Sequence, residues 1–503
     1  MTAVVETRDG RVRGEEVDGL RRFLGIPFAA TTAGAGRWRA PAPAQPWTGE
    51  RDATAFGPVA PQPDGMLALL PVGAVQDEDC LTLNVWTPGV AGRRPVMVWV
   101  HGGAFRQGAA RSAMYDGAAL ARRGDVVVVS LNYRLGALGF LAHPDLRDGD
   151  GGPAGNWGML DQVAALQWVR DNIAAFGGDP GNVTVFGESA GSMAIGCLLA
   201  SPSTKGLLHK AILQSGAPSA LALDRAAEIA ERLAKAAGVT SVAELRDVPV
   251  PAILAAQQQI DAEDAALRLI PSVDGHFLDR APLAALASGA AAHVPTVIGT
   301  NREEWKLWAP ADPRSRDLDD AGLRRRLSRV YDATDAEIDA LVEEFTRARA
   351  ATGQPIAPND LWFALETERV FRAPAMRTAE TLAAHQPATF AYLFTYGSPA
   401  MHGWLGACHA LEIAFVFGTQ GQAETALFTG SGPEADRLSE WLMDSWLAFA
   451  RTGDPSTEAL GRWPGYDARR RPTLVIGTEH AIVDAPYDDE RGTVAALLYR
   501  DDA

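Results

Sequence analysis

Ser189 lies in the stretch Gly-Glu-Ser-Ala-Gly, residues 187–191, between two apolar segments. The segment before it, 182–186, has the composition of a buried strand, and the segment after it begins like a small-residue helix. A strand, a tight turn and a helix in this order hold a serine hydroxyl out from the edge of a sheet. The same five residues also occur in ordinary Gly-Ser turns. In this context, however, the stretch predicts a serine nucleophile for acyl transfer.

Acyl transfer also needs hydrogen-bond donors for the negatively charged oxygen of its intermediate. Residues 101–105, His-Gly-Gly-Ala-Phe, directly follow an apolar segment over 96–100. Glycines let the backbone approach a substrate carbonyl, so we expect the amides of Gly103, Ala104 and Ala190 to form an oxyanion hole. Each such donor stabilises the transition state by roughly 3 kcal/mol. We interpret His101, in the same loop, as structural.

The general base should be a histidine late in the chain. Where a serine stands on such a strand–turn–helix elbow, as in α/β-hydrolases, the catalytic residues follow the order serine, acid, histidine. The segment over 385–387 indicates that His385 is a solvated helix end, and His480 lies beyond the last predicted strand. His402 and His409 belong to one loop region after the strand predicted over 389–394. The residues alone do not separate these two.

The acid that orients the base should follow a strand that lies between the nucleophile and the histidine. The strand predicted over 295–299 is followed by two adjacent carboxylates, Glu303 and Glu304. One of them would accept a hydrogen bond from the imidazole, and the other would be solvated or ion-paired. Glu188, beside the nucleophile, is expected to point away from it as a buried structural charge that needs an arginine.

The elements that must position these residues alternate between apolar strands and helices. This pattern predicts an α/β protein with the α/β-hydrolase fold, in which helices cover both faces of a large, mostly parallel, twisted central sheet. We expect one domain over 1–503, with helical insertions at about 224–257 and 317–384. A long loop over 64–77 is expected to border the binding site. Further strands are predicted over 1–26 (antiparallel), 125–131, 210–214 and 473–476, and a helix over 434–451.

Composition excludes several classes of function. The 503 residues are 47% hydrophobic and 21% charged, as in globular proteins, and the net charge of −16 disfavours nucleic-acid binding. No apolar run approaches the roughly 18 residues of a membrane span, and the first residues do not resemble a signal peptide. The three cysteines, Cys80, Cys197 and Cys408, are expected to be free thiols in a reducing compartment, which predicts a cytoplasmic location.

Characteristic motifs run in order through nearly the whole chain, at 23–29, 78–85, 101–105, 131–134, 176–180, 187–191, 214–217 and 406–412. In these motifs the chain resembles the type-B carboxylesterase family, specifically its bacterial para-nitrobenzyl-esterase-like carboxylesterases. The resemblance implies that the catalytic residues are Ser189, Glu304 and His409, and that Glu303 and His402 are not. It also implies two ion pairs in the core, Arg37 with Glu78 and Arg134 with Asp161.

The departures from the family pattern concern the pocket. Many members have a third glycine where this chain has Ala104, whose methyl group takes space near the alkoxy group and puts tertiary-alcohol esters in doubt. Trp305 replaces a common glycine, and we expect it to line the substrate pocket together with Phe105. Cys80 matches a disulfide-bonded cysteine of secreted relatives but has no partner upstream. The loop upstream of Cys80 also lacks the tryptophan with which cholinesterases bind a quaternary ammonium.

The predicted function is therefore that of a serine carboxylesterase, which hydrolyses esters of short to medium acyl chains through an acyl-enzyme intermediate. No metal or cofactor is expected, the partner is a small-molecule ester, and the chain should be a monomer or a weak homo-oligomer. Activity should rise with pH as His409 loses its proton, near its ordinary pKa of about 6.5. Two alternatives remain: the same fold acting mainly on amides, carbamates or lactones, and a non-catalytic binding relative.

Overall fold

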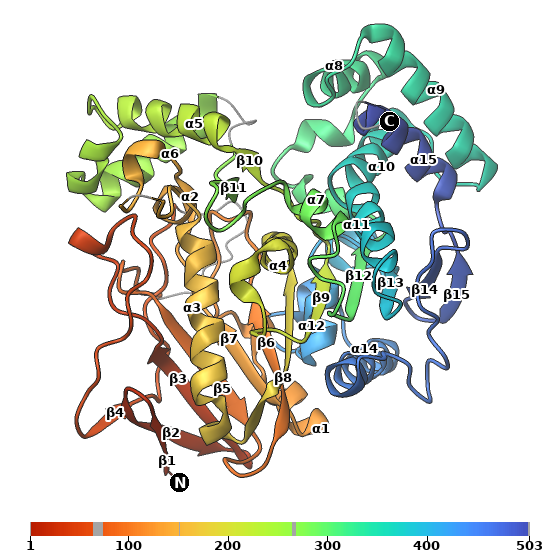
Figure 1. Ribbon diagram of the computed structural model, residues 1–503. Helices are drawn as coiled ribbons and strands as arrows, with labels where there is room; N and C mark the ends of the chain where they lie inside the picture. The colour runs from red at the N-terminus through yellow and green to blue at the C-terminus, as the bar shows by residue number, and fades with distance from the viewer. Residues whose placement is uncertain (1, 64–73, 150, 264–267, 501–503) are drawn as a thin grey trace.

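The molecule is built on a central 13-stranded sheet (Figure 1). The computed structural model describes residues 2–63, 74–149, 151–263 and 268–500. The strand order is β1-β2-β3-β5-β7-β6-β8-β9-β12-β13-β14-β15, with β4 paired to β2. The seven strands from β7 to β14 are parallel, and antiparallel strands continue the sheet at both ends. The predicted α/β-hydrolase architecture, a large and mostly parallel sheet, is confirmed.

The predicted strands lie close to their expected positions, whereas β4, β5 and β15, which begins at His480, were not predicted. Their bounds are β1 Thr2–Thr7, β2 Gly10–Val17, β3 Leu20–Pro27, β4 Glu50–Asp52, β5 Thr82–Thr87, β6 Arg94–Val100, β7 Val127–Leu131, β8 Gly178–Glu188, β9 Lys210–Gln214, β12 Thr296–Asn301, β13 Thr389–Phe394, β14 Pro472–Ile476 and β15 His480–Asp484. A separate two-stranded sheet joins β10 (Leu221–Ala222) and β11 (Ser272–Val273).

Successive side chains of the central strands enter two different hydrophobic cores, because side chains alternate between the faces of a sheet. In β6, Val96 and Val98 pack on the face covered by α3 and α4, which lie in front of the sheet in Figure 1. Met97 and Trp99 pack on the opposite face, beneath α1, α12 and α14. Burial on both faces explains why these strands are continuously apolar. These helices are α1 Ala118–Gly124, α3 Trp157–Asn172, α4 Ala190–Ala200, α12 Glu412–Phe417 and α14 Pro433–Thr452.

The helical insertions form two groups, and most of their helices lie above the sheet in Figure 1. The first contains α5 (Leu223–Ala236) and α6 (Val250–Glu263), so it extends beyond the expected end at 257. The second contains α8 (Asp320–Val330), α9 (Asp335–Ala351), α10 (Pro358–Thr367) and α11 (Ala373–Ala383). A third apolar cluster joins α8, α9 and α10 to α15 (Asp488–Leu498). None of the described helices combines the length and the apolar content that a membrane span requires.

Two buried ion pairs fix loops onto this frame, as the family resemblance implied. Arg37 meets Glu78 at 2.7 Å. Arg134 donates to both carboxylate oxygens of Asp161, at 2.6 and 2.8 Å, and its backbone amide donates to the same carboxylate. Asp161 belongs to α3, so the second pair ties the segment after β7 to a helix of the first core.

We expect Asp161→Asn to lower the free energy of unfolding by about 3–5 kcal/mol, because it leaves the buried Arg134 cation without its counter-charge. Equilibrium urea unfolding measures this change. Arg8→Gln is the control, since Arg8 pairs with Asp171 at the surface with 68% of its side chain exposed, and such pairs contribute at most about 1 kcal/mol. Equal effects of the two substitutions would contradict the prediction.

Candidate active site

Ser189 occupies a strained turn between β8 and α4. Its backbone angles are φ 55° and ψ −122°, a conformation that non-glycine residues rarely adopt. The neighbouring glycines are sterically required, because a Cβ at Gly187 or Gly191 would lie 2.5 or 2.0 Å from the carbonyl oxygen of Val100. The amide of Ser189 donates to the carbonyl of Gln214 at 2.8 Å. The contacts with β6 and β9 thus hold the serine in the geometry that the sequence pattern predicted.

Glu304 and His409 form a short, buried hydrogen bond. Glu304 Oε2 lies 2.6 Å from His409 Nδ1, and neither side chain is more than 5% exposed. The other carboxylate oxygen, Oε1, accepts from the amide of Asn301 at 2.7 Å. The backbones join as well, since the His409 amide donates to the Glu304 carbonyl at 3.2 Å. Both residues are therefore fixed before any substrate binds.

The two alternatives left open by the residues alone lie elsewhere. Glu303 pairs with Lys306 and Arg302, each at 3.2 Å, and accepts from the amide of Ala407 at 2.7 Å. His402 is exposed, in a turn where its φ is 57°. The structure thus brings together Glu304 and His409, and it gives Glu303 a role in holding the histidine loop.

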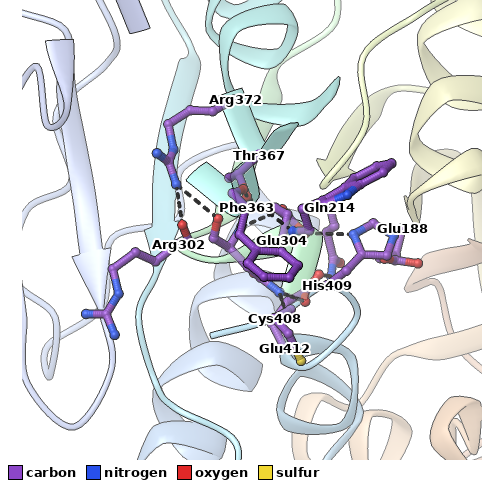
Figure 2. Close-up of polar contacts among 12 residues, drawn as sticks. Glu188, Gln214, Arg302, Glu304, Phe363, Thr367, Arg372, Cys408, His409 and Glu412 are labelled. Atoms are coloured by element: carbon purple, nitrogen blue, oxygen red, sulfur yellow. Dashed lines mark hydrogen bonds and ion pairs between the residues drawn. The ribbon is translucent and has the colours of Figure 1, made fainter. Parts of the chain in front are cut away.

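Glu188 meets the other nitrogen of the same imidazole. Its Oε1 lies 2.9 Å from His409 Nε2 (Figure 2). The expectation that Glu188 points away and needs an arginine was wrong. The reason is strand alternation: Glu188 is two residues after Phe186, which packs on the face of the sheet covered by α12, and His409 reaches the site from that same side.

The charges around His409 strongly affect its protonation. Burial by itself would lower the pKa of His409, but Glu188 and Glu304 outweigh it and hold that pKa well above 6.5. Burial raises the pKa of Glu188. Burial also raises the pKa of Glu412 to about 8, with the charges of Glu188 and Glu304 adding to the effect. The expectation that His409 titrates near 6.5 is therefore corrected upwards.

The third carboxylate, Glu412, has neutral hydrogen-bond partners. It accepts from the Asn301 side chain at 2.6 Å and from the Gln214 side chain at 3.2 Å. Three carboxylates thus surround one imidazole in a buried site, where they cannot all ionise without strong repulsion. Around neutral pH the cluster retains protons that exposed carboxylates would have lost.

The loop after β6 has the backbone conformation of an anion-binding turn. Gly103, Ala104 and Phe105 all have positive φ, at 113°, 55° and 60°. A Cβ at Gly103 would lie 1.9 Å from the carbonyl oxygen of Gln107, so only glycine fits there. Among the described residues, the amides of Gly103, Ala104 and Ala190 donate to no backbone carbonyl. These donors, one of them at the start of α4, remain available to a substrate.

His101 supports this loop from below. Its ring stacks on Tyr133 with ring centroids 4.5 Å apart, and the Tyr133 hydroxyl donates to the His101 carbonyl at 2.8 Å. Burial lowers the pKa of His101 to about 4. A neutral, fully buried imidazole is consistent with the structural interpretation of His101.

The aromatic rings that contact His409 are not the two that were expected, Phe105 and Trp305. Trp308 and Phe371 lie 5.0 and 4.7 Å from the imidazole between ring centroids. The Trp305 ring lies 4.7 Å from that of Trp308 in a tilted arrangement, one ring further out, and Phe105 is buried against Phe140. Sequence reasoning missed Trp308, although it follows Glu304 by one helical turn. Phe371 comes from a distant segment and gave no signal in the sequence. Of the expected 64–77 loop, residues 64–73 lie outside the described residues.

Comparisons with known proteins agree with this fold. The model of the carboxylesterase family matches residues 1–493. Para-nitrobenzyl esterase of Bacillus subtilis is 37% identical over 97% of each chain, and phenmedipham hydrolase of Pseudarthrobacter oxydans is 34% identical over 95% of this chain and 96% of its own. The crystal structure of the Geobacillus stearothermophilus carboxylesterase EST55 at pH 6.2 superposes with a TM-score of 0.86, at 39% identity, and covers 97% of this chain and 99% of its own. The chain belongs to the carboxylesterase family and is a carboxylic ester hydrolase.

We expect Glu188→Gln to lower the pKa of His409, because it removes one of the two negative charges that stabilise the imidazolium. Histidine-ring NMR over a pH series measures this pKa, with the resonance assigned by its loss in His409→Gln. Glu303→Gln is the matched control, since that carboxylate pairs with Lys306 and Arg302 rather than with the imidazole. An unchanged His409 pKa in Glu188→Gln would contradict this reading of the charge cluster.

Proposed function

We propose that this carboxylesterase uses Ser189 as nucleophile, His409 as general base and acid, and Glu304 to orient the imidazole. The observation that carries the proposal is the buried contact of 2.6 Å between Glu304 and His409, in the same site as a serine on a strained elbow. A carboxylate on Nδ1 fixes the tautomer that leaves Nε2 free to accept a proton.

The chemistry proceeds through an acyl-enzyme. His409 Nε2 takes the proton of the Ser189 hydroxyl while the oxygen attacks the ester carbonyl, and the amides of Gly103, Ala104 and Ala190 bind the oxyanion. The protonated His409 then protonates the departing alcohol, and the C–O bond of the ester breaks. Water that has lost its proton to His409 attacks the acyl-serine and releases the acid and the free Ser189.

The position of Glu188 gives the first step a requirement. The His409 Nε2 that must face the serine lies against Glu188, so this nitrogen has to turn from the carboxylate to the hydroxyl. His409 must also be neutral to act as a base. Because its pKa is held above 6.5, activity should rise with pH through a range above that value.

The substrate class rests on the rings around the site. Trp305, Trp308 and Phe371 form an aromatic wall beside His409. An apolar wall of this kind suits esters of short to medium acyl chains. The methyl group of Ala104 disfavours tertiary-alcohol esters. A series of 4-nitrophenyl esters from acetate to dodecanoate tests this, since hydrolysis that increases to the longest chain would argue for a deeper pocket.

Activity mainly on amides, carbamates or lactones is the second candidate. One relative, phenmedipham hydrolase, has a name that does not restrict it to esters. Turnover of an ester and an anilide with the same acyl group separates the two candidates. We also propose a single domain over 1–503, a monomer or weak homo-oligomer, and a cytoplasmic location, which the three free, buried cysteines support.

Ser189→Ala should lower the turnover of 4-nitrophenyl acetate by roughly 10⁴-fold or more, because no other group can form the acyl-enzyme. The control is Ser192→Ala, one turn along the same helix, whose hydroxyl is buried and donates to the carbonyl of Gly216 at 2.7 Å. A non-catalytic relative would show equally low activity in the wild type and both variants, and covalent labelling of Ser189 by an organophosphate would then fail.

Glu304→Gln should reduce kcat far more than Glu303→Gln. Of these two carboxylates, Glu304 contacts the imidazole, whereas Glu303 pairs with Lys306. A loss in the range of 10³- to 10⁴-fold is expected for the first substitution, since the amide no longer stabilises the protonated base. Steady-state kinetics with one ester, normalised to titrated active sites, compares the two variants. The assignment fails if Glu303→Gln proves the more damaging.

A further inference from the structure

A single π-helical turn, Glu368–Arg372, connects α10 to α11 and packs against the segment that carries Glu304. Such turns insert an extra residue into a helix and often occur at functional sites. We propose that Arg372, at the end of this turn, is a positioning residue that holds Glu304 in register with His409. The inference rests on the proposed role of Glu304 as the orienting acid.

The contacts run from Arg372 to the reacting imidazole in three steps. Arg372 donates to the carbonyl of Arg302 at 2.8 Å and to that of Asn301 at 3.3 Å (Figure 2). The Asn301 amide donates to Glu304 Oε1 at 2.7 Å. The other oxygen of Glu304 meets His409 at 2.6 Å. The carbonyl and the amide of Asn301 lie in adjacent peptide units on either side of one Cα, so a shift of the Asn301 backbone would move the carboxylate as well.

Arg372 is itself held rigidly. It is only 5% exposed, it is ion-paired with the fully buried Glu368 one turn earlier, and the ring of Tyr487 lies 4.8 Å from its guanidinium carbon. Burying such a pair stabilises a fold little compared with well-packed apolar residues. The fork of the guanidinium, by contrast, can bind a carboxylate and two carbonyls at once, which explains an arginine at this position.

Apolar packing alone does not hold the segment over 302–306 in place. A hollow lies beside the 302–306 backbone, and its lining includes Arg302, Arg349, Arg372 and Tyr487. Polar contacts from the π-helical turn and its flank take the place of dense packing there. Besides the two bonds from Arg372, the Thr367 hydroxyl accepts from the Trp305 amide at 3.2 Å, and the ring of Phe371 lies 4.7 Å from that of His409.

Arg372→Lys tests the inference while it preserves the charge opposite Glu368. One ammonium group cannot reach the carboxylate and both carbonyls in the same geometry. We expect kcat for 4-nitrophenyl acetate to fall about 10- to 100-fold, as for a small misplacement of a catalytic group, with KM little changed. The acid limb of the pH profile should move to lower pH, because a displaced Glu304 stabilises the His409 imidazolium less.

The measurements are expressed per active site, titrated by the burst of 4-nitrophenol or by a fluorophosphonate. A variant that merely folds less completely then keeps the wild-type kcat and pH profile. Arg349→Lys is the matched control, because Arg349 is also buried, pairs with buried Glu490 at 2.7 Å and lines the same hollow. Its other bond goes to the Pro355 carbonyl, so its kcat and pH profile should match the wild type.

The double variant Glu304→Gln/Arg372→Lys separates this inference from the proposed function. If Arg372 acts through Glu304, its substitution has little further effect once Glu304 is lost. A full additional loss would overturn the inference, and so would an Arg372→Lys enzyme indistinguishable from Arg349→Lys. In both cases a damaging Glu304→Gln leaves the proposed function standing, whereas a fully active Glu304→Gln refutes both.

Thr367→Val provides a second variant should Arg372→Lys not fold. It removes the acceptor of the Trp305 amide on the same segment but leaves the buried ion pair intact. A smaller loss of kcat with the same downward shift of the acid limb is expected. A wild-type profile per active site would overturn the inference that the π-helical turn positions Glu304.

Discussion

The contact between one buried imidazole and two carboxylates is the constraint on which the site depends. Glu304 holds Nδ1 of His409 and Glu188 lies against Nε2, so the protonated form of the ring is stabilised from both sides. With a raised pKa, His409 is neutral and able to act as a base only at higher pH, but its protonated form is well stabilised once it has accepted the serine proton. The site therefore favours the charge that develops on His409 during the reaction, at the cost of a higher pH for activity.

This charge cluster requires a rigid surround, because buried like charges repel one another. Glu304 and Glu412 are held by the backbone and side chain of Asn301, the last residue of β12. Glu188 ends β8 and Ser189 follows it, at a turn where Val100 of β6 leaves no room for a side chain on the flanking glycines. The ends of β8 and β12 thus place Glu188, the nucleophile and the Asn301 contacts at one edge of the sheet, an arrangement that suits preorganised catalysis.

Local patterns in the sequence predicted what depends on local geometry. The elbow around Ser189 and the loop over 101–105 have steric requirements that only small residues meet, so their residue types identify them. The choice of His409 over His402 depends on how one loop folds back onto β12, and the family resemblance rather than the residues decided it. The position of Glu188 follows from the alternation along β8, which turns its side chain toward His409, and not from its nearness to Ser189 in the sequence. Phe371 and Arg372 lie on a π-helical turn, whose phase no periodicity in the sequence reveals.

The strained turn at Ser189 and the charge cluster around His409 are held in place by different kinds of contact. The elbow needs close approach of β6, β8 and α4, and this is supplied by apolar packing of the strands on both faces. The acid segment after β12 lies beside a hollow instead, and there directional polar bonds from the second helical insertion replace packing. Hydrogen bonds fix orientation more sharply than apolar contacts, because their strength falls steeply with angle. The part of the site that must orient a proton acceptor is thus held by polar contacts, while the part that must only resist strain is held by the core.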